Sequence, residues 1–243
     1  MVVNKKRETV QRICSLIPST DFHKAGLLAN ISQAEGADYV EIHIPLTESP
    51  LSPDFLSKTS IKSILVIDAQ KIMAQTKAKT PRQEIQQNYQ AFIHQLINFQ
   101  PHAIEIDWDL LSKPLVRDSA EKMRKERIRF ILSKYYEYFP PKNDLLQTIK
   151  KMEEFDPDII KVVAPANNFY DSLTMLSLYH ELESINLLAI CSGEKGKLSQ
   201  IIAPFLGAEF TYGYLSRKTG VARIRLKQLK KNIETLASSF EDY

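Results

Sequence analysis

Glycine, cysteine and tryptophan are scarce in this chain. Its 243 residues include 7 glycines, 2 cysteines and 1 tryptophan. A collagen repeat needs glycine at every third position, and a disulfide framework needs several cysteine pairs, so both classes are excluded. Cys14 and Cys191 also lack the C-x-x-C spacing of metal and redox motifs. We therefore expect both cysteines to be small buried residues.

Long apolar runs and a strong net charge are absent as well. No apolar run approaches the roughly 20 residues of a membrane helix, and the start of the sequence lacks the apolar core of a signal peptide. The 32 basic residues nearly balance the 29 acidic ones. The densest basic stretch, Lys122–Arg129, includes a glutamate, as a solvated helix face does. We expect a cytoplasmic globular protein with no nucleic-acid and no membrane partner.

Short, β-branched apolar runs recur along the whole chain and predict strands. Each is 4 to 8 residues long and is apolar almost throughout, which is typical of strands with both faces covered. The runs are Arg12–Ile17, Tyr39–Ile44, Ile61–Ile67, Ala103–Asp107, Ile128–Leu132, Ile159–Ala164, Asn186–Cys191 and Glu209–Tyr212.

Stretches with helical spacing of apolar residues separate these runs. They include Phe22–Gln33, with Leu27, Leu28 and Ile31 on one expected apolar face, and Glu84–Asn98, Leu145–Phe155, Ser172–Glu183 and Leu226–Leu236. Strands that alternate with helices in this number predict the α/β class and a (β/α)8 TIM barrel, formed as one domain by residues 1–243. An open doubly wound sheet is the alternative architecture.

Lys161 is the most unusual residue of the predicted strands. Apolar residues flank it on both sides and at both i±2 positions. Burial disfavours the charged form of an amine, so this lysine is a candidate nucleophile for a Schiff base with a carbonyl substrate. The alternative is a lysine whose amine reaches solvent past the strand end.

Tyrosines and carboxylates lie at the ends of neighbouring predicted strands. Tyr135 and Tyr136 follow the fifth strand, and a phenol near a Schiff-base lysine can act as an acid or base. Glu105 and Asp107, at i and i+2 on the fourth strand, share one face, and one of them can partner Lys161 or orient a proton carrier. Packing and solvation are the alternative roles for both groups.

Anion and metal sites are weakly indicated. The loop 192–197 has two glycines and two lysines before a helix, which suits either an anion or an ordinary turn. The five histidines show no metal-ligand spacing, so we expect no metal and no cofactor.

Several segments together resemble type I 3-dehydroquinate dehydratase. They are Gly36–Glu41, Ile104–Asp107, Asp156–Pro165, Cys191–Gln200 and Leu206–Gly213, in the family's order along nearly the whole chain. Members of that family are (β/α)8 barrels, commonly dimeric, that dehydrate 3-dehydroquinate to 3-dehydroshikimate in the shikimate pathway. The resemblance therefore implies a cytoplasmic lyase, a homodimer, and a small keto acid as substrate.

The resemblance also assigns roles to individual residues. The family's Schiff-base lysine falls on Lys161, its glutamate on Glu41 and its serine on Ser199. The proton-carrying histidine is replaced by Tyr135 or Tyr136.

The substrate-binding positions depart from the family pattern. Two arginines appear here as His43 and Asp68, the arginine after the serine is Gln200, and the glutamine of the last loop corresponds to Arg223. Gln200 offers a neutral amide where arginine offers a charged fork, and Asp68 repels an anionic substrate. Arg223, Lys195 and Lys134 are the candidates for a relocated carboxylate clamp.

Three functions follow from these substitutions. The first is a divergent Schiff-base lyase with weakened or altered dehydratase activity. The second is a pseudoenzyme that binds a ligand or a partner. The third is an enzyme similar to class I aldolases that acts on another ketone through Lys161 and a tyrosine.

Overall fold

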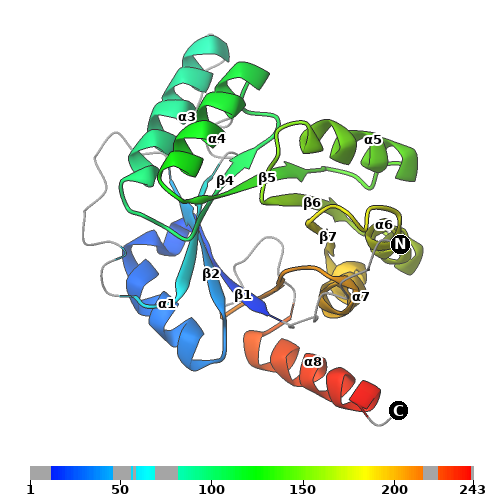
Figure 1. The fold of residues 1–243 in the computed structure, drawn as a ribbon. Helices are drawn as coiled ribbons and strands as arrows, with labels where there is room; N and C mark the ends of the chain where they lie inside the picture. Colours follow the sequence, from blue (N-terminus) through cyan, green and yellow to red (C-terminus); the bar gives the residue numbers. More distant parts are fainter. Residues whose placement is uncertain (1–11, 46–55, 57–58, 69–81, 216–223, 242–243) are drawn as a thin grey trace, which may run out of the picture.

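Eight parallel strands form the centre of the molecule (Figure 1). The computed structural model describes residues 12–45, 56, 59–68, 82–215 and 224–241. The strands are β1 (Ile13–Ile17), β2 (Tyr39–Ile44), β3 (Lys62–Ile67), β4 (Ala103–Asp107), β5 (Arg129–Tyr135), β6 (Ile159–Pro165), β7 (Leu187–Ser192) and β8 (Thr211–Gly213). All eight predicted strands are confirmed, and β5 continues three residues further than predicted, to Tyr135.

The strand order identifies the architecture. Neighbours follow the order β7-β6-β5-β4-β3-β2-β1-β8, so strands that are consecutive in sequence pair, and β8 returns to β1. A doubly wound sheet reverses its strand order at a switch point, and no such reversal occurs among these strands. The sheet therefore curves into a nearly closed (β/α)8 barrel, as predicted, and the alternative of an open sheet is wrong.

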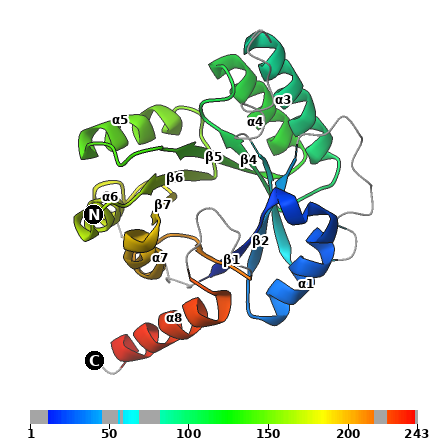
Figure 2. The same cartoon turned by 180° about the vertical axis from the view of Figure 1, so that it is seen from behind.

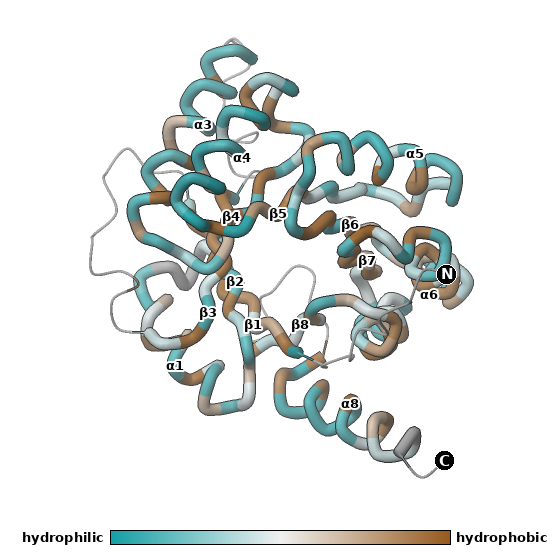
Figure 3. Tube along the Cα trace, viewed as in Figure 1, coloured by the Kyte–Doolittle hydropathy of each residue, from teal (hydrophilic) through white to brown (hydrophobic). Residues whose placement is uncertain are grey.

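Helices cover the outside of the barrel, as the view from behind also shows (Figure 2). They are α1 (Ala25–Ala34), α3 (Arg82–Ile97), α4 (Lys113–Lys125), α5 (Lys142–Glu153), α6 (Phe169–Glu181), α7 (Lys197–Ile202) and α8 (Leu226–Glu241). Three 3-10 helices, η1 (Ser19–Lys24), η3 (Glu194–Gly196) and η4 (Ala203–Leu206), complete the described helical segments. In Figure 3 the strands are largely apolar and the outer helices α3, α4 and α5 are largely hydrophilic. None of the described helices has the length and the apolar content to cross a membrane.

Helix α1 does not bury the face that its sequence predicts. Leu27 and Ile31 are 61% and 39% exposed, and the buried residues of the helix are Ala25, Ala29 and Ser32. Small side chains allow α1 to approach the barrel closely, and the Ser32 hydroxyl donates to the Ser15 hydroxyl of β1 at 2.8 Å. The predicted helix is confirmed, but of the three residues of its expected apolar face only Leu28 packs against the core, because small residues make the closest contact.

The barrel interior is apolar except for a set of buried polar side chains. Cys14 and Cys191 are fully buried free thiols, as expected. Glu41, Glu105 and Lys161 are also completely buried. Because buried charged groups require partners, we expect these three side chains to contact one another inside the barrel.

Candidate active site

Lys161 lies inside the barrel between two carboxylates. Its Nζ donates to Glu41 Oε2 at 2.7 Å and to Glu105 Oε2 at 2.8 Å. The three side chains come from β2, β4 and β6 and have essentially no solvent exposure. The alternative of a lysine that reaches solvent is therefore wrong. The partnership of Glu105 with Lys161, one of the roles considered for the fourth strand, is confirmed.

The two carboxylates determine the protonation of Lys161. Burial lowers the pKa of its amine, but the charges of Glu105 and Glu41 and their hydrogen bonds outweigh burial and raise the pKa above its ordinary value. For Glu41, burial raises the pKa of the carboxyl. The charge of Lys161 and the contacts with His43 and Lys161 outweigh burial and lower this pKa to about 2. Burial by itself favours the neutral amine, as considered from the sequence. The two carboxylates outweigh burial, and the raised pKa favours the ammonium form of Lys161 near neutral pH.

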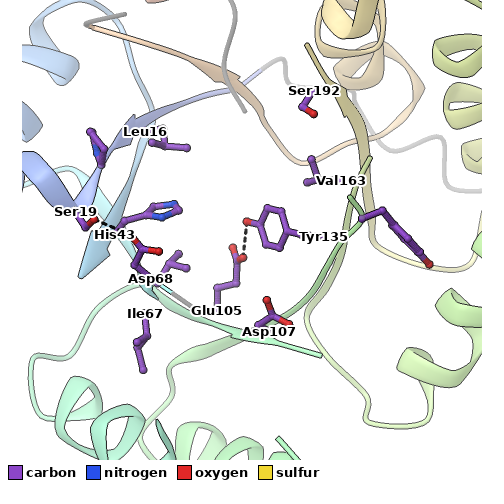
Figure 4. A pocket seen from close by; sticks show the side chains of 13 residues that line it. Leu16, Ser19, His43, Ile67, Asp68, Glu105, Asp107, Tyr135, Val163 and Ser192 are labelled. Carbon is purple, nitrogen blue, oxygen red and sulfur yellow. Dashed lines mark hydrogen bonds between the residues drawn. The ribbon is translucent and has the colours of Figure 1, made fainter. Parts of the chain in front are cut away.

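Tyrosine hydroxyls and a histidine bind the same carboxylates. The Tyr135 hydroxyl donates to Glu105 Oε1 at 2.8 Å, the bond drawn in Figure 4. The Tyr212 hydroxyl donates to Glu41, and His43 Nε2 lies 2.9 Å from Glu41 Oε1. Burial, followed by the charges of Glu105 and Glu41, raises the pKa of Tyr135 well above its ordinary value. Tyr135 is therefore a proton donor, and a poor base, near neutral pH.

Tyr136 and the two candidate lysines have other surroundings. Lys134 Nζ lies 5.1 Å from the centre of the Tyr136 ring and forms an ion pair with Asp109. Lys195 Nζ lies 5.0 Å from the centre of the Phe169 ring on α6. The described contacts therefore connect Tyr135, rather than Tyr136, to the lysine cluster.

A cavity of about 350 Å³ opens at the carboxyl ends of the strands, where barrel enzymes place their active sites. We call it the mouth cavity. It is lined by Leu16, Pro18, Ser19, His43, Val66, Ile67, Asp68, Glu105, Asp107, Tyr135, Tyr136, Val163 and Ser192. Figure 4 shows side chains from several strands around this space. Lys161 is not among the lining residues; its partner Glu105 and the adjacent Tyr135 are.

Two carboxylates of the cavity lie apart from the Lys161 cluster. Asp68 accepts a hydrogen bond from the Ser19 hydroxyl at 2.7 Å. Asp107 accepts one from the backbone N–H of Asp109 at 2.8 Å. Burial raises the pKa of Asp107 to about 6, against the lowering effect of that hydrogen bond. Asp107 therefore exchanges its proton closer to neutral pH than Tyr135 does.

Ser199 and Gln200 are buried beside β7 and make backbone contacts. Ser199 Oγ donates to the Gly196 carbonyl and accepts from the Cys191 N–H, each at 2.8 Å. Gln200 Nε2 donates to the Cys191 carbonyl at 2.8 Å. Neither residue lines the mouth cavity, so these contacts attach α7 to β7. Arg223 lies outside the described residues, and the binding role of all three stays a prediction.

Tyr212 and Ser19 contact site residues but were not predicted from the sequence as part of the site. Tyr212 is fully buried, and Lys161 Nζ lies 4.8 Å from the centre of its ring. A tyrosine inside a short buried strand was the available signal, because its hydroxyl requires a partner. Ser19, in the 3-10 helix after β1, gave no comparable signal. Within the described ranges, no group of three histidine, cysteine or acidic side chains is arranged to hold a metal ion.

Comparison with known proteins connects this geometry to one family. Residues 13–239 match the family described as type I 3-dehydroquinase. The 3-dehydroquinate dehydratase of Thermococcus onnurineus is 31% identical over 127 residues, which are 52% of this chain and 58% of that protein. That of Thermococcus gammatolerans is 33% identical over 109 residues, 44% of this chain and 50% of that protein. The matched regions therefore span little more than half the length of these relatives.

Solved structures show the same fold over nearly the whole chain. The 3-dehydroquinate dehydratase of Geobacillus kaustophilus superimposes with a TM-score of 0.78 at 15% identity and covers 95% of this chain and 92% of that chain. The enzyme of Aquifex aeolicus gives a TM-score of 0.71 at 19% identity, with 93% and 98% covered. At such identities the likeness shows the fold alone.

Proposed function

Because this chain belongs to the type I 3-dehydroquinase family, we propose that it is a divergent Schiff-base lyase that acts through Lys161 and has weakened activity on 3-dehydroquinate. The observation that supports the proposal best is the buried Lys161, whose amine lies between Glu41 and Glu105. The Tyr135 hydroxyl donates to Glu105, one of these two carboxylates. A buried amine with adjacent carboxylates has a base for each proton that imine formation requires.

The proposed chemistry uses the groups in this order. Lys161 transfers its extra proton to Glu105, which also lines the mouth cavity, and the neutral amine attacks the ketone carbon. The resulting carbinolamine loses water and leaves a protonated imine. A proton then leaves the carbon next to the imine, and the hydroxyl group on the following carbon departs as water after it accepts a proton. Hydrolysis of the imine regenerates Lys161 and releases the unsaturated ketone.

The proton carriers account for the weakened activity. Tyr135, with its raised pKa, donates a proton to a leaving hydroxyl more readily than it removes one from carbon. Asp107, whose pKa is about 6 and which lines the same cavity, is a better base near neutral pH than Tyr135. Replacing a positioned histidine by weaker carriers costs on the order of 10²–10⁴ in rate.

One observation favours the pseudoenzyme as a second candidate. Lys161 is fully buried and does not line the cavity, so Glu105 or Tyr135 must move before a ketone reaches its amine. If these side chains do not move, the cavity can bind a ligand without a covalent step. The aldolase-like alternative uses the same lysine and Tyr135 and differs only in the bond that is broken.

Intact mass spectrometry after incubation with 3-dehydroquinate and borohydride tests the proposal. We expect one reduced adduct, located on Lys161 by peptide mapping, together with slow formation of 3-dehydroshikimate measured by its absorbance. Lys161→Met, which keeps the length of the side chain, should show no adduct while its circular dichroism matches that of the wild type. Absence of an adduct with any ketone would contradict the Schiff base and favour the pseudoenzyme.

A further inference from the structure

His43, on β2, lines the mouth cavity and contacts a carboxylate of the lysine cluster. Its Nε2 lies 2.9 Å from Glu41 Oε1, while Lys161 Nζ donates to the other oxygen, Oε2, at 2.7 Å. The imidazole and the amine therefore contact the two oxygens of one carboxylate. The side chain of His43 is 21% exposed, whereas Glu41 and Lys161 are completely buried. Of these three side chains, the imidazole is thus the one that a ligand in the cavity can reach.

Glu41 determines which nitrogen of the imidazole carries the proton. The pKa of Glu41 is about 2, so this residue is a carboxylate near neutral pH. A carboxylate only accepts hydrogen bonds, and Nε2 of His43 is therefore the protonated nitrogen that donates to it. In a neutral imidazole the lone pair then lies on Nδ1. An imidazole held in this way can remove a proton, and the adjacent anion stabilises the imidazolium ion that forms.

Tyr135 lies opposite His43 in the cavity that both residues line. Figure 4 shows the imidazole and the phenol pointing toward one another, from β2 and β5. The Tyr135 hydroxyl donates to Glu105 at 2.8 Å, and its raised pKa makes it a proton donor. A ligand between the two rings therefore has a group suited to accept a proton on one side and a group suited to donate one on the other.

Asp107 is the competing base, and its contacts differ from those of His43. It ends β4, and its carboxylate accepts a hydrogen bond from the backbone N–H of Asp109 at 2.8 Å. Its described hydrogen bonds do not connect it to Glu41 or Lys161. The proton to be removed lies on the carbon next to the imine, close to Lys161 Nζ. A base that shares a carboxylate with that nitrogen is better placed for this carbon.

We propose that His43 is the catalytic base that removes the proton from the carbon next to the imine, with Glu41 as its orienting partner and Tyr135 as the acid. The proposal rests on the Schiff base of the proposed function and adds the residue that carries out the proton removal.

The proposed step is balanced in protons and electrons. The electron pair of the C–H bond forms the double bond of an enamine, the imine π pair moves to the nitrogen, and the proton binds Nδ1 of His43. The enamine then forms the imine again while the carbon–oxygen bond breaks, and Tyr135 protonates the departing hydroxyl to give water. The proton on the imidazolium ion returns to Tyr135 through the solvent.

Deuterium exchange separates this step from imine formation. The protein is incubated with 3-dehydroquinate in heavy water, and NMR measures deuterium at the carbon next to the ketone, with Lys161→Met as the background. Borohydride trapping measures the adduct on Lys161. His43→Gln keeps an N–H for Glu41 and has no basic nitrogen. We expect its adduct formation to stay within about threefold of the wild type, while exchange and formation of 3-dehydroshikimate fall about a hundredfold.

Two further variants complete the experiment. His43→Ala leaves the space of the ring empty, and imidazole added to the solution should restore its exchange about tenfold or more. This variant decides the question by itself if His43→Gln does not fold. His180→Gln is the matched control, because it makes the same substitution at a histidine of α6 whose side chain is 88% exposed. It should leave both adduct formation and exchange unchanged.

The outcomes distinguish the base from the Schiff base. If the wild type forms no adduct on Lys161, the Schiff base and this role of His43 both fail. If the wild type forms the adduct and His43→Gln exchanges deuterium as fast, the role of His43 is overturned and the lyase proposal stands. Loss of exchange in Asp107→Asn, with full exchange in His43→Gln, would assign the base to Asp107. Equal losses of adduct and exchange in His43→Gln would mean that His43 only positions Glu41, which also overturns the proposal.

Discussion

At the scale of single residues, one lysine organises the barrel centre. Lys161 is buried without exposed surface, and its two glutamate partners come from β2 and β4, neither of which pairs with β6. A buried charge without partners costs several kcal/mol, so each member of this cluster depends on the others. The same hydrogen bonds that stabilise the ammonium ion also hold it away from ligands, which makes proton transfer within the cluster the first step of any reaction.

The lowered pKa of Glu41 predicts a loss of stability in acid. The unfolded carboxyl has the ordinary pKa of 4.5, and the folded one has a pKa of about 2. A depressed folded pKa contributes stability above the unfolded value, and this contribution disappears as pH falls from about 4.5 to about 2. Its full size is about 3 kcal/mol by linkage.

Urea unfolding at several pH values measures this effect. The free energy of unfolding of the wild type should exceed that of Glu41→Gln at pH 5, and the difference should shrink steadily toward pH 3. A difference that stays constant over this range would contradict the assigned pKa.

At the scale of elements, close backbone approach attaches the short helix α7 to β7. Gly196, the last residue of η3, lies so near β7 that an added Cβ would be 2.5 Å from the carbonyl oxygen of Cys191. The side chains of Ser199 and Gln200 then bond to the backbone of the same residue, Cys191. Ser199 and Gln200 therefore hold α7 against β7, independently of any contact with a ligand.

Gly196→Ala should destabilise the protein by about 2 kcal/mol, because the clash is with backbone and cannot be relieved by a side-chain rotation. Thermal unfolding by circular dichroism measures the loss. Gly207→Ala is an informative comparison, because an added Cβ there meets nothing within 4 Å and the cost is only that of its φ of +107°. Equal stability of Gly196→Ala and the wild type would show that the approach of η3 to β7 is looser than described.

At the scale of the whole molecule, the two ends of the barrel carry different polar clusters. The carboxyl ends of the strands hold the mouth cavity, whereas Glu209 precedes β8 at the opposite end. Its carboxylate accepts a bidentate contact from Arg129 and hydrogen bonds from Asn186 and Tyr39, each at 3.2 Å. These partners come from or adjoin β5, β7 and β2, so one carboxylate connects strands that are distant around the barrel.

This division predicts that Glu209→Gln changes stability and not chemistry. The variant loses the charge opposite Arg129 and should lower the free energy of unfolding by about 2 kcal/mol, measured by urea denaturation. The rate of adduct formation on Lys161 should remain within twofold of the wild type. A large loss of labelling in a folded Glu209→Gln variant would mean that the two ends are coupled.

The sequence alone determined the strands and the barrel, and it made Lys161 the most unusual residue of the predicted strands. Strands buried on both faces have continuous apolar runs, and a lysine within such a run is conspicuous, so these features are local and readable. Residues 13–239 also match one known family.

Only the tertiary structure decided which groups meet. Glu41, Glu105 and Lys161 lie far apart in sequence, and the barrel brings their side chains within hydrogen-bond distance. This contact raises the pKa of the lysine instead of lowering it, because the charges of two neighbours outweigh burial. Three other features also depend on three-dimensional packing, which the periodicity of one segment does not record. They are the buried face of α1, the contact of Tyr135 rather than Tyr136 with Glu105, and the backbone contacts of Ser199 and Gln200.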